Sequence, residues 1–271
     1  MGMTAGAKVF WFFFSKKNIL GLAAAVLAVP AHAADDDAAR AARWHDLAKL
    51  IFDGRQPVDQ AGWLTIDAPV RAMDAALVPV TIGLAPDKKI KGLYLVVDEN
   101  PSPVAAHIEF GPESDTHTLT LRVRVDQYTN LHAVAETADG RLISTARFIK
   151  AAGGCSAPGS EAPELALKEA GQMKLRVHGE RAELLIRHPN FNGMQMDQVT
   201  RLYTPARYID SITVAYEGQR VLHMDTDISL ASDPAIGFGF KSDGTGTLTV
   251  DVADTSHATW HRDFPLTPHG S

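Results

Sequence analysis

The chain is poor in cysteine, because its 271 residues contain a single one, Cys155. One cysteine excludes an internal disulfide, so the thiol is free, modified or bonded to another molecule. Positive charge is also scarce: the formal net charge is −6 and no basic stripe appears, which argues against a nucleic-acid-binding protein. Glycine-rich phosphate loops and the nucleophile turn of serine hydrolases are missing as well. The 45% hydrophobic content nevertheless predicts a globular protein.

Long apolar runs are confined to the amino end of the chain. Two lysines at 16–17 precede an apolar run at 19–29, which is short for a membrane span. Residues 31–33 read Ala-His-Ala, the small-x-small pattern of a cleavage site. We therefore expect a signal peptide, residues 1–33, cleaved near Ala33, and a periplasmic mature protein that is not attached to the membrane. The alternative is an uncleaved membrane anchor.

The surroundings of the cysteine indicate how the thiol is used. Gly153 and Gly154 precede Cys155 and Ser156 follows it, so no bulky sequence neighbour can hide the sulfur. Glycine also permits backbone conformations that are closed to other residues. The sequence predicts an exposed thiol on a thin, flexible arm that enters a narrow pocket of another protein. A chance unpaired cysteine is the alternative, and a sulfur atom sealed in its own protein would contradict the arm.

Short apolar or alternating segments separated by turn residues dominate the chain, which predicts an antiparallel all-β fold. One helix is expected, near 38–53, where apolar residues recur at helical spacing. A Gly/Ser/Pro-rich stretch divides the strands into two series and predicts two small sandwich domains, 38–152 and 169–267, joined by a linker at 153–168. The expected strands lie at 64–69, 78–83, 90–97, 105–110, 118–125, 131–136, 142–149, 174–178, 182–187, 208–216, 220–224, 235–241 and 245–252.

A cysteine enzyme remains an alternative to a carrier. A catalytic thiol needs a nearby base, and the sequence leaves open that His107, His132 or His188 reaches the sulfur. Lys150 could favour the thiolate if the arm folds back. Catalytic nucleophiles are usually held rigidly, whereas a glycine flank favours mobility, so we favour a carrier.

No metal or cofactor site is expected. His257 and His261 are four residues apart, but they lie in a strand-like tail, where that spacing does not share a face, and we expect both on the surface. Residues 225–227 read Asp-Thr-Asp without the rest of a calcium loop, so we expect a strand end there. Met194 and Met196 follow a phenylalanine and form a soft apolar patch that either docks a partner or packs the two halves together.

With these residues in view, the chain resembles the SoxY and SoxZ sulfur-carrier proteins fused head to tail. Gly153, Gly154 and Cys155 look like the start of the Gly-Gly-Cys-Gly-Gly carrier motif that ends free-standing SoxY. The second half looks like SoxZ over a series of small matches in one order: Ile186, Arg187, His188, Pro189, Gly193, Pro205, Ile209, Gly218, Val221, Ile228, Ser229, Asp233, Pro234, Phe238, Gly246, Leu248, Val250, Val252 and Asp254.

The resemblance implies two immunoglobulin-like β-sandwiches, packed as an intramolecular version of the SoxY–SoxZ heterodimer. It also implies a non-enzymatic carrier in which Cys155 holds a thiosulfonate or persulfide cargo on an arm formed with Gly153, Gly154 and Ser156. The expected partners are periplasmic sulfur-oxidation enzymes or a quinoprotein dehydrogenase. A passive adaptor on such a dehydrogenase is the alternative. One departure matters: Ser156 replaces a glycine of the motif and the chain continues, so the arm is tethered at both ends and stiffened by Pro158.

Overall fold

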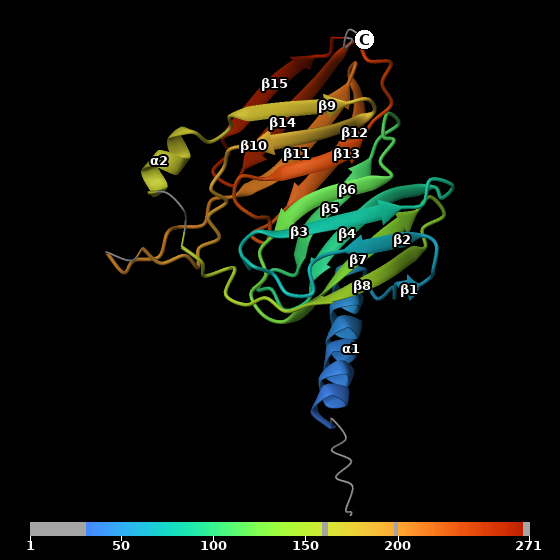
Figure 1. The fold of residues 1–271 in the computed structure, drawn as a ribbon, viewed down its shortest axis with the longest axis vertical. Coiled ribbons are helices and arrows are strands. Elements are labelled where there is room, and N and C mark those ends of the chain that lie inside the picture. The colour runs from blue at the N-terminus through green and yellow to red at the C-terminus, as the bar shows by residue number, and fades with distance from the viewer. Residues whose placement is uncertain (1–30, 159–161, 198–199, 268–271) are drawn as a thin grey trace, which may run out of the picture.

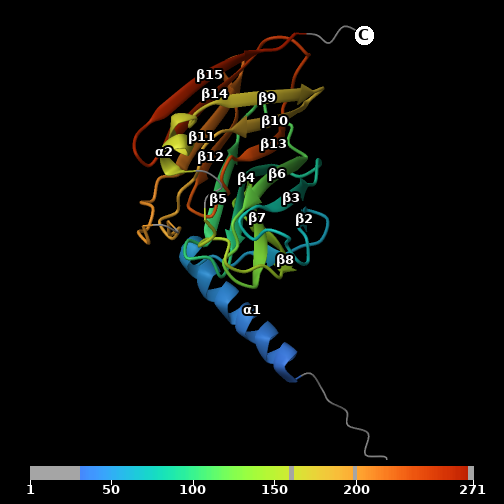
Figure 2. The same cartoon turned by 60° about the vertical axis from the view of Figure 1, so that its left-hand side comes forward.

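The structure, a computed structural model, describes residues 31–158, 162–197 and 200–267. Two β-sheets lie face to face, and the helix α1 (Ala31–Ile51) projects from the end of the sandwich far from β15 (Figures 1 and 2). A short helix, α2 (Pro163–Lys168), lies at the side of the sheets. The strands are β1 (Val58–Asp59), β2 (Leu64–Asp67), β3 (Val78–Leu84), β4 (Ile90–Val97), β5 (Val104–Phe110), β6 (Thr118–Val123), β7 (Thr129–Thr137), β8 (Leu142–Ile149), β9 (Met173–His178), β10 (Arg181–Ile186), β11 (Ile209–Tyr216), β12 (Gln219–Thr226), β13 (Ala235–Gly239), β14 (Thr247–Asp254) and β15 (Thr259–Pro265).

Both sheets run through both halves of the chain. The larger sheet has the order β1-β8-β7-β4-β5-β12-β11-β14-β15, and the smaller one has the order β2-β3-β6-β13-β10-β9. The halves join edge to edge, where β5 pairs antiparallel with β12 and β6 pairs with β13. The predicted all-β sandwich fold is therefore confirmed. The division into domains at 153–168 stays a prediction, since each half contributes strands to both sheets.

The burial of the strands follows their sequence pattern. In β3, Val78, Val80 and Ile82 are buried and alternate with less buried residues, as expected for a strand with one face on a core. Strand β7 is buried almost continuously because α1 covers its outer face. Trp44, Ala48 and Phe52 pack there against Val134, Leu142 and Tyr94.

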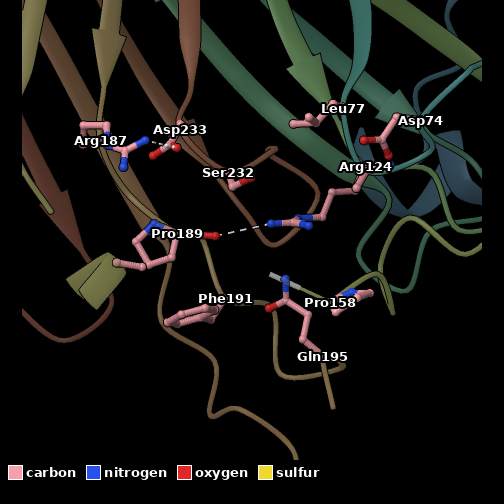
Figure 3. Close-up of a pocket in the computed structure, with 12 residues that line it drawn as sticks. Asp74, Leu77, Arg124, Pro158, Arg187, Pro189, Phe191, Gln195, Ser232 and Asp233 are labelled. Atoms are coloured by element: carbon pink, nitrogen blue, oxygen red, sulfur yellow. Dashed lines mark hydrogen bonds and ion pairs between the residues drawn. The ribbon is translucent and has the colours of Figure 1, made fainter. Parts of the chain in front are cut away.

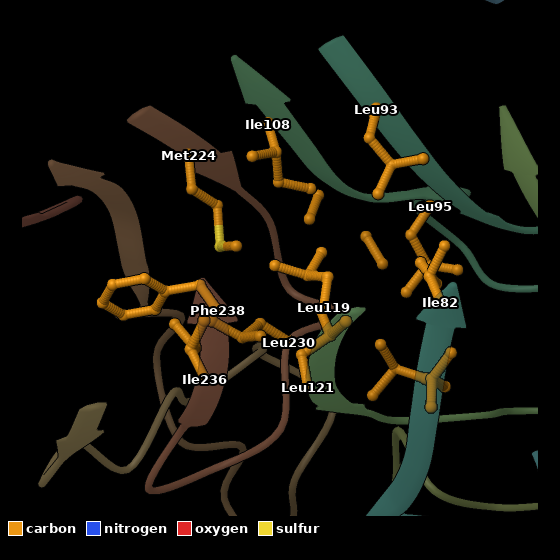
Figure 4. Packing of buried hydrophobic residues seen from close by; sticks show 14 of the residues in the cluster. Ile82, Leu93, Leu95, Ile108, Leu119, Leu121, Met224, Leu230, Ile236 and Phe238 are labelled. Carbon is orange, nitrogen blue, oxygen red and sulfur yellow. The ribbon is translucent and has the colours of Figure 1, made fainter. Parts of the chain in front are cut away.

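One hydrophobic core extends between the two sheets and across the junction of the halves. Figure 4 shows Ile108 of the first half beside Met224 of the second, above Leu119 and Phe238 of the smaller sheet. All four side chains are fully or almost fully buried. Because apolar burial is the main stabilising term, the two halves stabilise each other.

The helical segments differ from the expectation. Helix α1 begins at Ala31, so the predicted cleavage residues lie in its first turn, while the apolar run at 19–29 lies outside the described residues. The expected linker contains α2, which the sequence pattern does not foresee. Across the ranges that the structure describes, no helix combines the length and the apolar character that crossing a membrane requires.

Candidate functional site: a buried thiol beside an unpaired arginine

The thiol of Cys155 is fully buried, with 0% of the residue exposed. The expectation of an exposed thiol is therefore wrong. The groups that hide it come from distant parts of the chain, which local composition cannot reveal. The turn at 153–156 lies against Val125 and Asp126, directly after β6, and beside Ala75. We call Ala75, Val125, Asp126 and Asn192 the thiol seat.

Three hydrogen bonds hold the turn on the thiol seat. The backbone N–H of Gly153 donates to the carbonyl oxygen of Asp126 at 2.8 Å, and that of Gly154 donates to Val125 at 2.9 Å. From the second half of the chain, Nδ2 of Asn192 donates to the carbonyl oxygen of Cys155 at 2.7 Å. The seat is thus built from both halves.

The two glycines serve the docked turn. A Cβ atom on Gly154 would clash with the carbonyl oxygen of Ala75 and lie 2.7 Å from that of Val125. Gly153 has φ +78°, in the left-handed region that other residues rarely adopt. The Ser156 hydroxyl closes the turn by donating to the carbonyl oxygen of Gly153 at 3.2 Å. The sequence analysis interprets the glycine flank as a source of flexibility. In the structure, the two glycines let the turn lie close against Ala75 and Val125.

Burial also changes the acidity of the thiol. Loss of hydration and the negative charge of Asp126 raise the pKa of Cys155 to about 11, although the positive charge of Arg124 opposes them. At neutral pH the docked sulfur is therefore a protonated thiol, and the thiolate is the nucleophilic form. The cation that acts on the sulfur is Arg124, which sequence reasoning missed; Lys150, which could have favoured the thiolate, is not among the groups that shift its pKa.

Arg124 is a buried cation whose positive charge is not matched by an adjacent carboxylate. It is 2% exposed, and its Nη2 donates to the carbonyl oxygens of Asn190 and Pro189 at 3.1 and 3.4 Å. Its Nε has no hydrogen-bond partner among the described residues, and within that part of the chain no carboxylate lies at ion-pair distance. Burial lowers the pKa of the guanidinium. A buried charge without a counter-ion is costly, so its presence needs a reason.

A cavity of about 150 Å³ lies beside this guanidinium. In Figure 3, Arg124 reaches across it toward Pro189, with Ser232 on one side and Phe191 and Gln195 on the other. The Oε1 atom of Gln195 is buried there and has no hydrogen-bond partner in the part of the chain that the structure describes. We call this space the Arg124 cavity.

A larger groove of about 520 Å³ adjoins the Arg124 cavity and shares Pro158, Phe191 and Gln195 with it. Met196 lines the groove and, like Met194, belongs to neither hydrophobic core. Its rim carries two exposed apolar side chains, Leu202 and Tyr203, which are 70% and 62% exposed. This position favours docking of a partner over packing between the halves, and that role stays a prediction.

A buried polar network anchors the loop at 189–192, which borders both the seat and the cavity. Nδ1 of His188 lies 2.7 Å from Oδ1 of Asn190, and its Nε2 lies 3.3 Å from Asp254. Arg207 donates to the same carboxylate at 2.7 Å. Burial opposes ionisation of Asp254, but hydrogen bonds from Ser256, Arg207, Ala258 and His188 outweigh it and lower its pKa to about 2. Burial lowers the pKa of His188, so the imidazole is neutral.

The three histidines that could have acted as a base are held elsewhere. His188 belongs to the network just described. His132 pairs with Asp98 at 2.9 Å and stacks on Trp44, and His107 stacks on Tyr94. Among the described residues, none of the three has an interaction with Cys155, so the arrangement gives no support to a cysteine–histidine enzyme.

The two remaining candidate histidines lie on the surface, as expected. His257 is exposed, and His261 is exposed and pairs with Asp251 at 2.7 Å. Residues 225–227 stand at the end of β12. In the part of the chain that the structure covers, no group of three His, Cys, Asp or Glu side chains could hold a metal ion.

Comparison with known proteins gives two family matches in tandem. The family model described as sulfur oxidation protein SoxY matches residues 48–155 and ends at the cysteine, and the one for sulphur oxidation protein SoxZ matches residues 172–265. Among solved structures, the sulfur carrier protein SoxY from Chlorobium limicola f thiosulfatophilum is 24% identical and covers 43% of this chain and 98% of its own, with a TM-score of 0.37. A superoxide reductase (neelaredoxin) from Ignicoccus hospitalis is 16% identical and covers 39% of this chain and 90% of its own, with a TM-score of 0.29. No curated protein matches by sequence. The two tandem matches identify the chain as a member of the SoxY and SoxZ families, fused in one polypeptide.

Proposed function

We propose that the protein is a periplasmic covalent carrier in which Cys155 holds a sulfur cargo and returns to the thiol seat between deliveries. The SoxY and SoxZ matches support the sulfur-carrier role. The observation that carries the finer proposal is the burial of Cys155 in a turn held by few hydrogen bonds. The turn has two states: docked, with the thiol protected, and undocked, with the thiol open to a partner enzyme.

Undocking of the turn from the thiol seat costs little free energy. A neutral hydrogen bond contributes about 1 kcal/mol net, so three of them hold the turn by only a few kcal/mol. A partner that binds the undocked turn more tightly than the docked one shifts the equilibrium toward loading. Once hydrated, the thiol regains a pKa near ~8.5, which restores a useful fraction of thiolate.

Loading requires an electron acceptor. Joining the Cys155 thiol to the terminal sulfur of thiosulfate forms an S–S bond and a cysteine thiosulfonate, and it releases one proton and two electrons. This chain contains a single cysteine, so it has no internal disulfide that could take the electrons. We infer that a redox partner takes them, either a sulfur-oxidation enzyme or a quinoprotein dehydrogenase of the periplasm.

The groove beside the Arg124 cavity supports a second candidate, a passive adaptor. Leu202 and Tyr203 place exposed apolar surface at its rim, where a partner protein can dock. In that case the thiol is dispensable, and the protein only binds a dehydrogenase.

One pair of measurements separates these functions. The intact mass of the protein purified from its native periplasm should show an adduct on Cys155, and the mass increment identifies the cargo. The Cys155→Ser variant should abolish function in the cell. An unmodified thiol in every preparation, together with full function of the variant, would leave the adaptor.

A further inference from the structure

The buried guanidinium of Arg124 points to an anion. Among the described residues its Nε has no partner and its Nη2 binds two carbonyl oxygens, and 2% of the residue is exposed. The protonated thiol of Cys155 is neutral and cannot serve as the counter-ion. Arginine in protein interiors is normally matched to a carboxylate or an oxyanion, which its planar fork binds through two parallel hydrogen bonds.

The other charged side chains around the Arg124 cavity do not neutralise the guanidinium of Arg124. Arg187 pairs with Asp233 at 2.6 Å and with Glu169 at 2.8 Å, so those carboxylates are engaged with a different cation. Asp74 acts on Arg124 through its charge only, and its side chain is exposed and accepts the backbone N–H of Ala76 at 2.8 Å. Solvent partly screens this exposed carboxylate, so it offsets the charge of Arg124 only in part.

The cavity has the size and the lining for a small anion. Its volume of about 150 Å³ is several times the ~30 Å³ that one water molecule occupies in the liquid. Gln195 brings a buried side-chain amide whose Oε1 has no partner within the described ranges, and an amide can present its NH2 to an acceptor. Ser232 adds a hydroxyl to the wall.

We propose that the Arg124 cavity is a binding site for a tetrahedral sulfur oxyanion, and that it receives the acidic end of the cargo carried on Cys155. The second clause rests on the proposed carrier function. The cavity and the turn share their walls: Pro158, three residues after Cys155, lines the cavity, and Phe191 lines it next to Asn192 of the seat. Arg124 is thus a positioning residue that selects an anionic cargo over a neutral one.

The first test is anion binding without covalent chemistry. In the full chain carrying Cys155→Ala, sodium thiosulfate and sodium sulfate are titrated by calorimetry, with sodium chloride at matched ionic strength as the reference. We expect saturable binding of both sulfur oxyanions. Arg124→Gln should weaken that binding at least tenfold. Arg122→Gln, which removes an exposed arginine two residues earlier, should change it less than twofold.

A second variant keeps the proposal testable if Arg124→Gln fails to fold. Asp74→Asn retains the oxygen that accepts Ala76 N–H and removes a negative charge from the cavity wall. It should tighten oxyanion binding severalfold. Equal affinities in all variants, or no saturable heat in the parent, would overturn the site.

Different results would contradict the covalent-carrier proposal and the oxyanion site in the Arg124 cavity. An adduct on Cys155 from native periplasm with no oxyanion binding to the Cys155→Ala chain contradicts the Arg124 cavity and keeps the carrier. Oxyanion binding that depends on Arg124, without any adduct in native preparations, contradicts the carrier and keeps the cavity. Selenate-soaked crystals give an independent reading, because the oxygens around the anomalous selenium peak must lie within hydrogen-bond distance of Arg124.

Discussion

Asn192 donates a hydrogen bond of 2.7 Å to the carbonyl oxygen of Cys155, and this bond connects the SoxZ half to the turn that ends the SoxY half. In a fused chain the two partners of this bond are always present together. The SoxZ half therefore acts as part of the cover over the thiol. Whatever loosens the loop at 189–192 should also release the turn.

Removal of this bond should expose the thiol more often. We expect Asn192→Ala to raise the rate of Cys155 alkylation by iodoacetamide about fivefold to tenfold, because one hydrogen bond is worth about 1 kcal/mol and a lost partner leaves a buried carbonyl unsatisfied. Alkylation followed by intact mass measures it. Gln219→Ala, at an exposed amide at the start of β12, is the control and should leave the rate unchanged.

The two glycines of the arm should respond very differently to substitution. Gly154→Ala places a methyl group against the carbonyl of Ala75, so the docked turn cannot form and the thiol should alkylate at nearly the rate of an unfolded control. Gly153→Ala meets no close neighbour and only strains a left-handed backbone, at a cost of about 1 kcal/mol, so its rate should rise only several-fold. Equal alkylation rates in the two variants would show that the close contact between Gly154 and Ala75 does not hold the turn in place.

Sequence reasoning located the strands well because one-face burial leaves a clear alternation, as in β3. It did not foresee that β5 pairs with β12, since a register between distant strands is set by contacts that no local pattern records. The site shows the same contrast. Cys155 and its glycines stand out in the sequence, but Ala75, Val125 and Asn192 that bury it lie far away along the chain.

No signal in the sequence singles out Arg124. It takes the next polar position of the alternation in β6, after Thr120 and Arg122, so the pattern predicts an exposed side chain. Its burial is unusual, because charges are rarely fully buried without a partner. Whether a carboxylate lies beside it depends on the tertiary structure, where none does among the described residues, and no sequence pattern records this.

The pH dependence of thiol modification should reveal the docked state. An exposed thiol reacts faster as pH rises and levels off above its pKa of ~8.5. The docked form favours the protonated thiol, since burial and Asp126 raise its pKa to about 11. Docking is therefore fully favoured below about pH 8.5, the pKa of the undocked thiol, and weakens as pH rises from there toward 11. We expect the alkylation rate to keep rising above pH 9, with circular dichroism as the control that the fold persists. A plateau near pH 8.5 would indicate an exposed thiol.

Mild acid should loosen the SoxZ half through His188. Burial holds its pKa below the ordinary 6.5, so the unfolded chain binds the proton first. This stabilisation is complete above about pH 6.5 and is lost as pH falls through the folded value. Urea unfolding at pH 7.5 and 5.5 should show a smaller free energy of unfolding at the lower pH. The difference should shrink in His188→Gln and persist in the control His178→Gln, at an exposed position.

The hydrophobic core that the two halves share should make them lose stability together. Met224 of β12 and Ile108 of β5 face each other across the junction of the halves, and both are 0% exposed. Met224→Ala removes buried volume there and should cost about 2–5 kcal/mol. Because the core is continuous, the loss should appear in both halves alike. Hydrogen exchange read by mass spectrometry should show β7 and β14 losing protection together, in one transition and by the same free energy. Tyr128→Ala, at an exposed side chain, should change neither. If β14 alone lost protection in Met224→Ala, the halves would be separate folding units, and the thiol seat, which needs both, would open whenever the SoxZ half unfolded.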